Sequence, residues 1–229
     1  MIGEPRIHVH ECESTQLLLF ESSLPEGAVA TADHQTGGRG RLGRSWVEPA
    51  ATSVLCSVLL RPPGERPPAQ LSLVGGLAAA ETIEAVTGLG ALIKWPNDVL
   101  VNGRKVAGVL AEKRGDAVVL GIGINVNQEP AELPPDARVP AGSLRSLTGL
   151  THDREEVLAA LLGRLDALYE AWCSAGLDAV FGGLAARDFL RGRRVEVDGV
   201  AGLAGGIDRE GRLLVDGRAV ESGEVRLGG

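Results

Sequence analysis

The most distinctive stretch of the sequence lies between residues 37 and 46, where three arginines and four glycines stand within ten positions without an acidic residue. Glycines let backbone amides approach a bound anion closely, and guanidinium groups neutralise the anion through paired hydrogen bonds. The stretch therefore predicts a cradle for a phosphate or a carboxylate. A solvated surface loop is the alternative. Trp46, which ends the stretch, could cap an apolar ligand or pack on the core.

The same glycines match a dinucleotide fingerprint, Gly38-x-Gly40-x-x-Gly43. That fingerprint must open a helix. Here a proline and then an apolar, β-branched run over 52–60 follow, and such a run predicts a buried strand. We therefore reject a Rossmann fold. A dinucleotide-dependent oxidoreductase is an alternative function that rests only on these glycines. An absence of NAD binding would exclude it.

A second candidate is the run Lys94-Trp95-Pro96-Asn97-Asp98. Proline has no amide hydrogen for a sheet ladder, so the predicted strand over 92–95 ends here and Lys94 lies near its end. A lysine held in this way can stabilise negative charge that develops on a reacting carboxylate or phosphate. An exposed lysine before a turn is the alternative.

A third candidate is the segment from Gly121 to Asn127, in which glycines alternate with isoleucines. One face of such a strand lacks side chains, so a flat ligand could lie against the backbone, although a sheet bend would explain the pattern equally well. Asn125 and Asn127 could hold a phosphate or a metal-bound water, or cap a turn.

The remaining candidates are polar residues beside predicted element ends. Ser14, Thr15 and Gln16 begin a predicted helix, and Gln35 precedes the glycine-rich stretch. Alone, they would be assigned as a helix cap and a loop residue. The sequence contains neither a Gly-x-Ser-x-Gly nor a Gly-x4-Gly-Lys-Ser/Thr motif, so it indicates neither α/β-hydrolase nor P-loop chemistry.

The elements that must position these residues indicate an α+β fold. Asn102-Gly103 between apolar runs predicts a tight hairpin, and a further turn near residue 115 returns the chain into a strand. Successive hairpins favour a mixed, largely antiparallel sheet, packed by helices over 69–86 and 153–173. Short apolar pieces separated by glycines predict a small β-barrel at the end. We therefore expect domains at residues 1–186 and 187–229.

Composition restricts the class of function. The chain has 229 residues, with 23 Lys and Arg against 30 Asp and Glu, a formal net charge of -7. This charge argues against a broad surface for nucleic acid or anionic lipid. Cys12, Cys56 and Cys173 are far apart, which predicts reduced thiols rather than a disulfide framework or a zinc site. With neither a secretion signal nor a membrane-spanning run, we expect a cytoplasmic protein.

Taken together and in this order, the motifs resemble those of biotin protein ligases, the biotin–acetyl-CoA-carboxylase ligases. The resemblance covers Ser14 to Asn127, and the glycine-rich ending resembles that family's small SH3-like domain. It implies a class II synthetase-like catalytic domain with this appended domain. The bifunctional members begin with a DNA-binding winged helix. Only thirteen residues precede Ser14, so we expect a monofunctional ligase that does not bind nucleic acid.

The resemblance also implies roles for individual residues. Lys94 corresponds to a catalytic lysine, and Arg41, which we also expect to be catalytic, lies in the loop that closes over biotin and its adenylate. The implied biotin- and adenylate-binding residues are Ser14, Thr15, Gln16, Gln35, Gly38, Arg39, Gly40, Arg41, Arg44, Trp46, Lys94, Gly108, Gly121, Gly123, Ile124 and Asn125.

The implied reaction joins biotin to ATP with Mg²⁺ as cofactor, and then transfers biotin to a lysine of a biotin carboxyl carrier protein domain. No membrane partner is expected, and a homodimer is left open. A lipoate ligase, which shares this chemistry, and a non-catalytic biotin sensor are the rivals.

Overall fold

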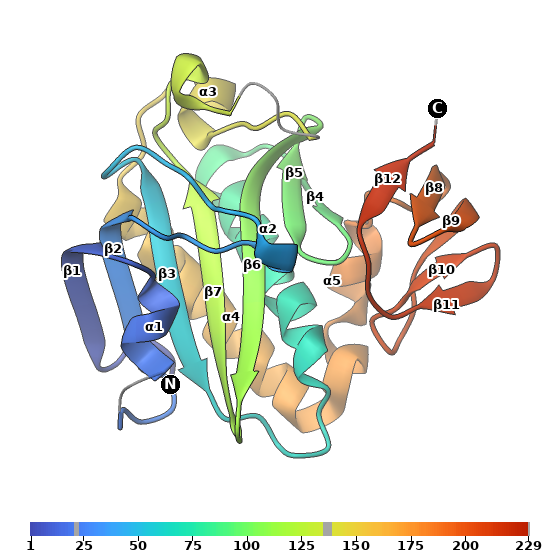
Figure 1. Cartoon of the computed structure of the whole chain (residues 1–229), viewed down its shortest axis with the longest axis horizontal. Helices are drawn as coiled ribbons and strands as arrows, with labels where there is room; N and C mark the ends of the chain where they lie inside the picture. The colour runs from blue at the N-terminus through green and yellow to red at the C-terminus, as the bar shows by residue number, and fades with distance from the viewer. Residues whose placement is uncertain (21–22, 135–138, 229) are drawn as a thin grey trace.

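Seven strands form the larger sheet of the computed structural model, in the order β1-β2-β3-β7-β6-β5-β4 (Figure 1). The structure describes residues 1–20, 23–134 and 139–228. Every pairing in this sheet is antiparallel except that of β1 with β2, which confirms the expected mixed, largely antiparallel sheet. The strands are β1 (Arg6–Cys12), β2 (Val29–Gln35), β3 (Ser53–Leu60), β4 (Ala91–Lys94), β5 (Asp98–Val101), β6 (Arg104–Arg114) and β7 (Ala117–Asn125).

The β5–β6 hairpin turns at the two residues that the sequence predicts. Asn102 and Gly103 have φ values of 50° and 75°, the left-handed conformation that a tight two-residue turn requires. Gly115, with a φ of 62°, lies in the next turn, which leads from β6 into β7. The register places Lys94 opposite Asp98, Asp98 opposite Gly108 and Gly108 opposite Gly123, in one row across the four strands from β4 to β7.

Helices cover both faces of the larger sheet. The long helices α2 (Leu71–Thr87) and α4 (Arg154–Ala175) pack behind it, and the short α1 (Thr15–Phe20) lies in front (Figure 1). Alternate residues of a strand face opposite sides, so Val29 packs in the core under the long helices and Ala30 packs with α1. Two shorter helices, α3 (Leu144–Thr148) and α5 (Phe181–Ala186), each contact α2.

The C-terminal strands form a second, five-stranded antiparallel sheet in the order β11-β10-β9-β8-β12. Its edge strands, β11 and β12, do not pair with each other in the described part of the chain, so the sheet is open and the expected barrel is not confirmed. Strands of three residues offer few ladder hydrogen bonds with which to close a barrel. The strands are β8 (Arg194–Val197), β9 (Val200–Ile207), β10 (Leu213–Val215), β11 (Arg218–Val220) and β12 (Val225–Leu227).

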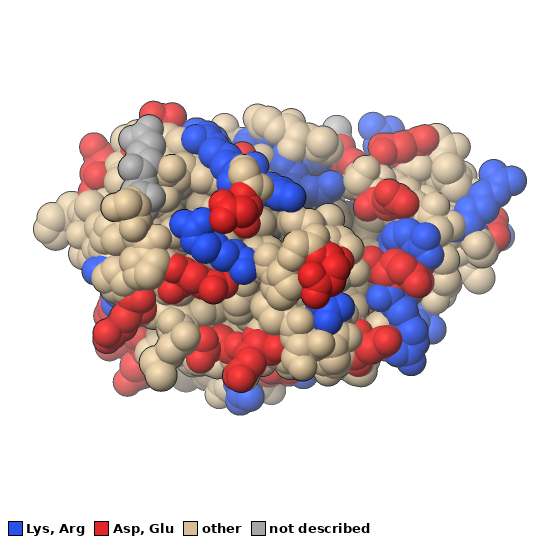
Figure 2. Space-filling model, turned by 90° about the horizontal axis from the view of Figure 1, so that it is seen from below, with Lys and Arg blue, Asp and Glu red and all other residues tan. Residues whose placement is uncertain are grey.

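Two surface properties are relevant to the classes of partner. None of the described helices is long and apolar enough to cross a bilayer. On the face shown in Figure 2, acidic and basic side chains are interspersed rather than gathered into a field of one sign.

Candidate active site

A cavity of about 130 Å³ opens where the glycine-rich loop, the front of the larger sheet and the edge of the second sheet meet. Its walls include three segments far apart in sequence, namely the loop from Arg39 to Trp46, the stretch from Lys94 to Asp98, and residues 223–225 ahead of and in β12. Thirteen of the residues expected from the sequence line it. They are Ser14, Thr15, Gln16, Gln35, Arg39, Gly40, Arg41, Arg44, Trp46, Lys94, Gly108, Gly121 and Gly123.

Three expected residues lie outside this cavity. Gly38 lines a neighbouring groove on the outer side of the loop. The side chain of Ile124 is fully buried in the core behind the sheet, because it alternates with Gly123, which faces the cavity. Asn125 lines a second cavity instead.

The cationic side chains of separate segments converge on the cavity. Lys94 is 8% exposed, and burial lowers the pKa of its ammonium group while Asp98 opposes that shift. Burial also lowers the pKa of Arg41, again against Asp98. Arg41 donates from Nη1 to Oδ1 of Asn97 at 3.4 Å, which joins the loop to the Lys94–Asp98 stretch. An anion that enters here meets two desolvated positive charges.

The other two arginines of the loop are held by acids from different elements. Arg39 lies 3.8 Å from the carboxylate of Glu112 on β6. Arg44 forms an ion pair with Glu224, just ahead of β12. The second sheet therefore contacts the loop directly.

A hydrogen-bond network fixes the polar end of the cavity. The carbonyl oxygen of the Gln35 side chain accepts from the backbone N–H of Thr15 at 2.8 Å and from its hydroxyl at 3.1 Å. The hydroxyl of Ser57 on β3 lies 2.7 Å from that of Thr15. Parallel pairing of β1 with β2 brings the ends of these strands together, and so joins the segment after β1 to Gln35.

The glycine face of β7 is covered by the protein's own side chains. A Cβ at Gly121 would lie 3.2 Å from Cδ of Gln16, and one at Gly123 would lie 2.7 Å from the Trp46 indole. Gln16 donates from Nε2 to the carbonyl of Leu110 at 3.1 Å. The alternating glycines suggest a bare face, but the side chains of Gln16 and Trp46 cover it. The buried Nε1 of Trp46 has no hydrogen-bond partner among the described residues.

A second cavity of about 800 Å³ adjoins the first and shares Arg44, Trp46 and Lys94 with it. Asn125 lies in its wall, where its amide donates to the carbonyl of Gly142 at 2.9 Å. The side chain of Asn127 instead exchanges hydrogen bonds with the backbone of His152, at 2.8 and 3.0 Å, and so supports a loop rather than a ligand.

Three acidic residues around the cavities, Asp98, Glu112 and Glu224, are paired with cations. Asp98 lies 2.6 Å from the ammonium of Lys105, and Glu112 and Glu224 face the arginines of the loop. These residues do not form a ready magnesium site by themselves. We therefore derive no catalytic step through Mg²⁺.

Residues 223–225 and Lys105 were not identified from the sequence. The C-terminal residues lie just ahead of and in the short strand β12, whose pairing partner β8 is distant in sequence, so local pattern carried no signal for them. Asp98 belongs to the Lys-Trp-Pro-Asn-Asp run, and that motif could have indicated its place in the site.

Comparisons with known proteins agree with this geometry. A model of the biotin/lipoate A/B protein ligase family matches residues 9–129. The chain is 34% identical to the bifunctional ligase/repressor BirA of Bacillus subtilis, with 100% of this chain and 75% of the relative covered. It is 40% identical to the biotin–[acetyl-CoA-carboxylase] ligase of Mycobacterium tuberculosis, with 85% and 76% covered. The biotin protein ligase of Aquifex aeolicus in complex with biotin and ATP superimposes with a TM-score of 0.89 at 34% identity, over 98% of this chain and 99% of that one.

Proposed function

Because the chain belongs to the biotin/lipoate A/B protein ligase family and is therefore a ligase, we propose that it activates biotin with ATP and transfers it to a lysine of a biotin carboxyl carrier protein domain. The observation that carries this proposal is the convergence of Arg39, Arg41, Arg44 and Lys94 on one cavity. Support also comes from relatives in Mycobacterium tuberculosis and Paracoccus denitrificans, which are named biotin–[acetyl-CoA-carboxylase] ligases.

In the first half-reaction, the carboxylate of biotin attacks the α-phosphorus of ATP, and the bond from this phosphorus to the oxygen that bridges it to the β-phosphate breaks. Biotinyl-5'-adenylate forms and pyrophosphate departs. Both reactants are anions, so their repulsion opposes the reaction. The desolvated charges of Lys94 and Arg41 offset that repulsion, and they stabilise negative charge that develops on the α-phosphate. The Thr15, Gln35 and Ser57 network offers hydrogen-bonding groups for the polar ring of biotin.

The second cavity is the proposed nucleotide compartment. It adjoins the first cavity at Lys94 and Arg44, where the carboxylate and the α-phosphate would meet. Trp46 lies between the two compartments, and its buried Nε1–H is a donor for a bound ligand. Mg²⁺ belongs to the proposal as the companion of ATP.

In the second half-reaction, the neutral amine of an acceptor lysine attacks the activated carbonyl, the acyl–phosphate bond breaks, and AMP leaves. The enzyme itself need not form a covalent bond to biotin. Cys56, the thiol nearest the cavity, supports this view, because burial raises its pKa to about 12 and keeps it protonated. The loop from Arg39 to Trp46 limits access of water to the adenylate, whose hydrolysis is the competing reaction.

The proposal also includes a division of the chain into two domains. We assign residues 1–186 to a catalytic domain and residues 187–229 to a small C-terminal domain of the SH3-like kind. Contacts of residues 223–225 with Lys94 and Arg44 support a role for the C-terminal domain in completing the site.

The decisive experiment measures biotin-dependent exchange of labelled pyrophosphate into ATP, followed by transfer of biotin to a purified carrier domain. Exchange with biotin and transfer to the carrier are expected. Exchange that responds to lipoate and not to biotin would identify a lipoate ligase. Biotin binding without exchange would identify a sensor, and either of these results would overturn the proposal.

A further inference from the structure

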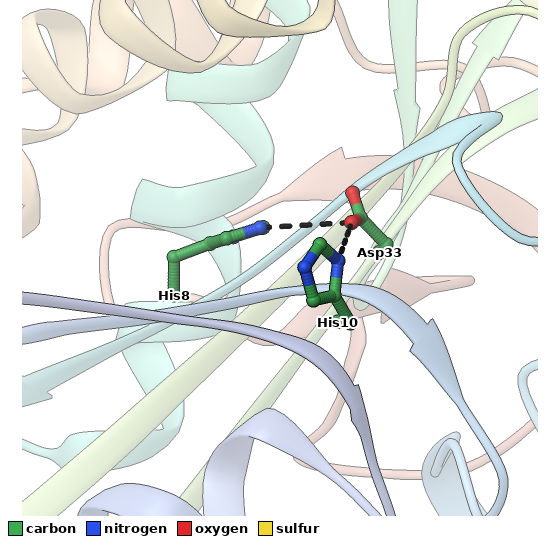
Figure 3. A group of neighbouring side chains, drawn as sticks. All are labelled: His8, His10 and Asp33. Carbon is green, nitrogen blue, oxygen red and sulfur yellow. Dashed lines mark hydrogen bonds and ion pairs between the residues drawn. The ribbon is translucent and has the colours of Figure 1, made fainter.

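We propose that His8, His10 and Asp33 form a binding site for a divalent transition-metal ion, such as Zn²⁺, outside the ligase cavities. The two imidazoles and the carboxylate converge on one point between β1 and β2 (Figure 3). Nitrogen and carboxylate oxygen are the ligands that Zn²⁺ and neighbouring divalent ions accept. In the described part of the chain, no other three His, Cys, Asp or Glu side chains come so close together.

The parallel register of β1 and β2 brings the three side chains together. His8 and His10 are two residues apart, so they project from the same side of β1. The register pairs Val9 with Ala32, which sets Asp33 beside His10 on the next strand. An edge strand and its parallel neighbour thus supply a cluster that the sequence separates by more than twenty residues.

The distances suit a small ion after little rearrangement. Nε2 of His8 lies 3.6 Å from Oδ2 of Asp33, and Nδ1 of His10 lies 3.1 Å from the same oxygen. All three ligand atoms lie within 4.8 Å of one another. Ligands of tetrahedral zinc at about 2.0–2.1 Å from the ion are about 3.3 Å apart. Small rotations of the exposed imidazoles are therefore enough to bring them to coordinating distance.

Thr31 selects the nitrogen that His8 presents. The hydroxyl of Thr31 donates to the carbonyl of Ile7 at 3.4 Å, so its oxygen accepts a hydrogen bond from the N–H at Nδ1 of His8, at 3.0 Å. In the neutral ring Nε2 then carries the lone pair, and Nε2 is the nitrogen that faces Asp33. A partner that fixes the tautomer and orientation of a ligating histidine is typical of metal sites.

Neighbouring charges orient the carboxylate and leave one oxygen to the ion. Arg154, at the start of α4, binds Oδ1 of Asp33 at 2.9 Å, whereas Oδ2 faces the imidazoles. Arg6 is paired with Glu155 through two hydrogen bonds of 2.6 and 2.8 Å. Arg154 therefore positions the carboxylate of Asp33. The positive charge of Arg154 also weakens the binding of a cation, so we expect a dissociation constant in the micromolar range.

The site is open to solvent and close to the polar end of the ligase cavity. The side chain of His10 is 96% exposed, so ions can enter and water can complete the coordination. β1 ends two residues before Ser14 and β2 ends at Gln35, and both of these residues line the cavity. A bound ion would tie the two strands together and stabilise the folded chain by mass action.

The first test is calorimetric titration of the reduced full-length protein with Zn²⁺. The wild type is expected to bind one equivalent, and the unfolding midpoint should rise by a few degrees at saturation. His10→Gln should weaken binding at least tenfold and abolish the shift, while its midpoint without metal stays that of the wild type because the side chain is exposed. His152→Gln, which changes a histidine outside the cluster, should bind like the wild type. Unchanged binding in His10→Gln would overturn the proposal.

The second test identifies the ligand atoms without relying on affinity. Saturation with Zn²⁺ should shift the NMR resonances of Nε2 of His8 and Nδ1 of His10, and leave those of the other histidines in place. Cys12→Ser, which removes a thiol at the end of β1, should bind as before. Loss of binding in Cys12→Ser, or shifts confined to other histidines, would show that the ion lies elsewhere.

Discussion

The ammonium group of Lys94, at the end of β4, donates a hydrogen bond to the backbone carbonyl of Val225 in β12 at 3.1 Å. The bond joins the larger sheet to the second sheet across a sequence separation of 131 residues. A hydrogen bond from a charged donor in a desolvated place is strong, so it holds the ammonium in the wall of the cavity. The C-terminal sheet thus positions the cation on which the proposed chemistry depends.

Replacing Lys94 tests that dependence. Lys94→Ala should lower biotin-dependent pyrophosphate exchange at least about a hundredfold, because an electrostatic group that acts on the developing charge typically contributes this much or more. Lys113→Ala, which removes an exposed lysine on β6, is the matched control and should exchange normally. Thermal unfolding shows whether each variant is folded. Near-normal exchange by a folded Lys94→Ala protein would exclude Lys94 from catalysis.

Arg41 is expected to retain the adenylate rather than only to assist its formation. It joins the loop to Asn97, so Arg41→Gly removes both a charge and this contact. We expect biotinyl-5'-adenylate to leak from the variant about tenfold faster or more. Retention is measured by separating free from bound adenylate after a single turnover. Arg61→Ala, a change in an exposed ion pair with Asp116, is the control. Equal retention in Arg41→Gly and the wild type would refute the role.

Local signals predicted much of the larger sheet and its long helices. Asn102-Gly103 specifies its own turn, because these residue types accept a positive φ, and Gly88 ends α2 in a left-handed conformation. The apolar run over 52–60 similarly corresponds to β3. Each of these features is determined by residues that are neighbours in sequence.

Features that depend on distant partners were not predicted. β1 alternates half-buried apolar residues with exposed polar ones, and it is a strand because β2 pairs with it in parallel. Residues 223–225 join the cavity only through the packing of the second sheet. The place of Trp46 over Gly123 also depends on two segments that local pattern cannot connect. The closure of the C-terminal barrel was predicted from glycine-separated strands, whose spacing does not determine whether the last edges pair.

The close approach of Trp46 to Gly123 predicts a sensitive position. Gly123→Ala would put a methyl group 2.7 Å from the indole, so the ring must move out of its place between the two cavities. We expect KM for biotin or ATP to rise about tenfold or more, with a smaller change in kcat. Gly64→Ala is the matched control, because a Cβ there meets nothing within 4 Å. Unchanged KM values in Gly123→Ala would show that the position of Trp46 does not matter for substrate binding.

Glu48, a buried carboxyl two residues after the glycine-rich loop, predicts a pH dependence of stability. It is 4% exposed, and burial raises the pKa of its carboxyl to about 7, against the hydrogen bond from the backbone of Gln35 and the proximity of His34. Between the ordinary pKa of 4.5 and about 7, the unfolded chain releases this proton while the folded chain keeps it. The free energy of unfolding therefore falls as pH rises through this window, and levels off above it.

Urea unfolding of the wild type and of Glu48→Gln at a series of pH values isolates this contribution, because the other titrating groups are common to both proteins. Relative to the variant, the wild type should lose on the order of 2 to 3 kcal/mol between pH 4.5 and 7. Its difference from the variant should then level off by about pH 8. Parallel stability curves across the whole window would mean that Glu48 titrates alike in the folded and unfolded chains, and that burial does not keep its carboxyl protonated.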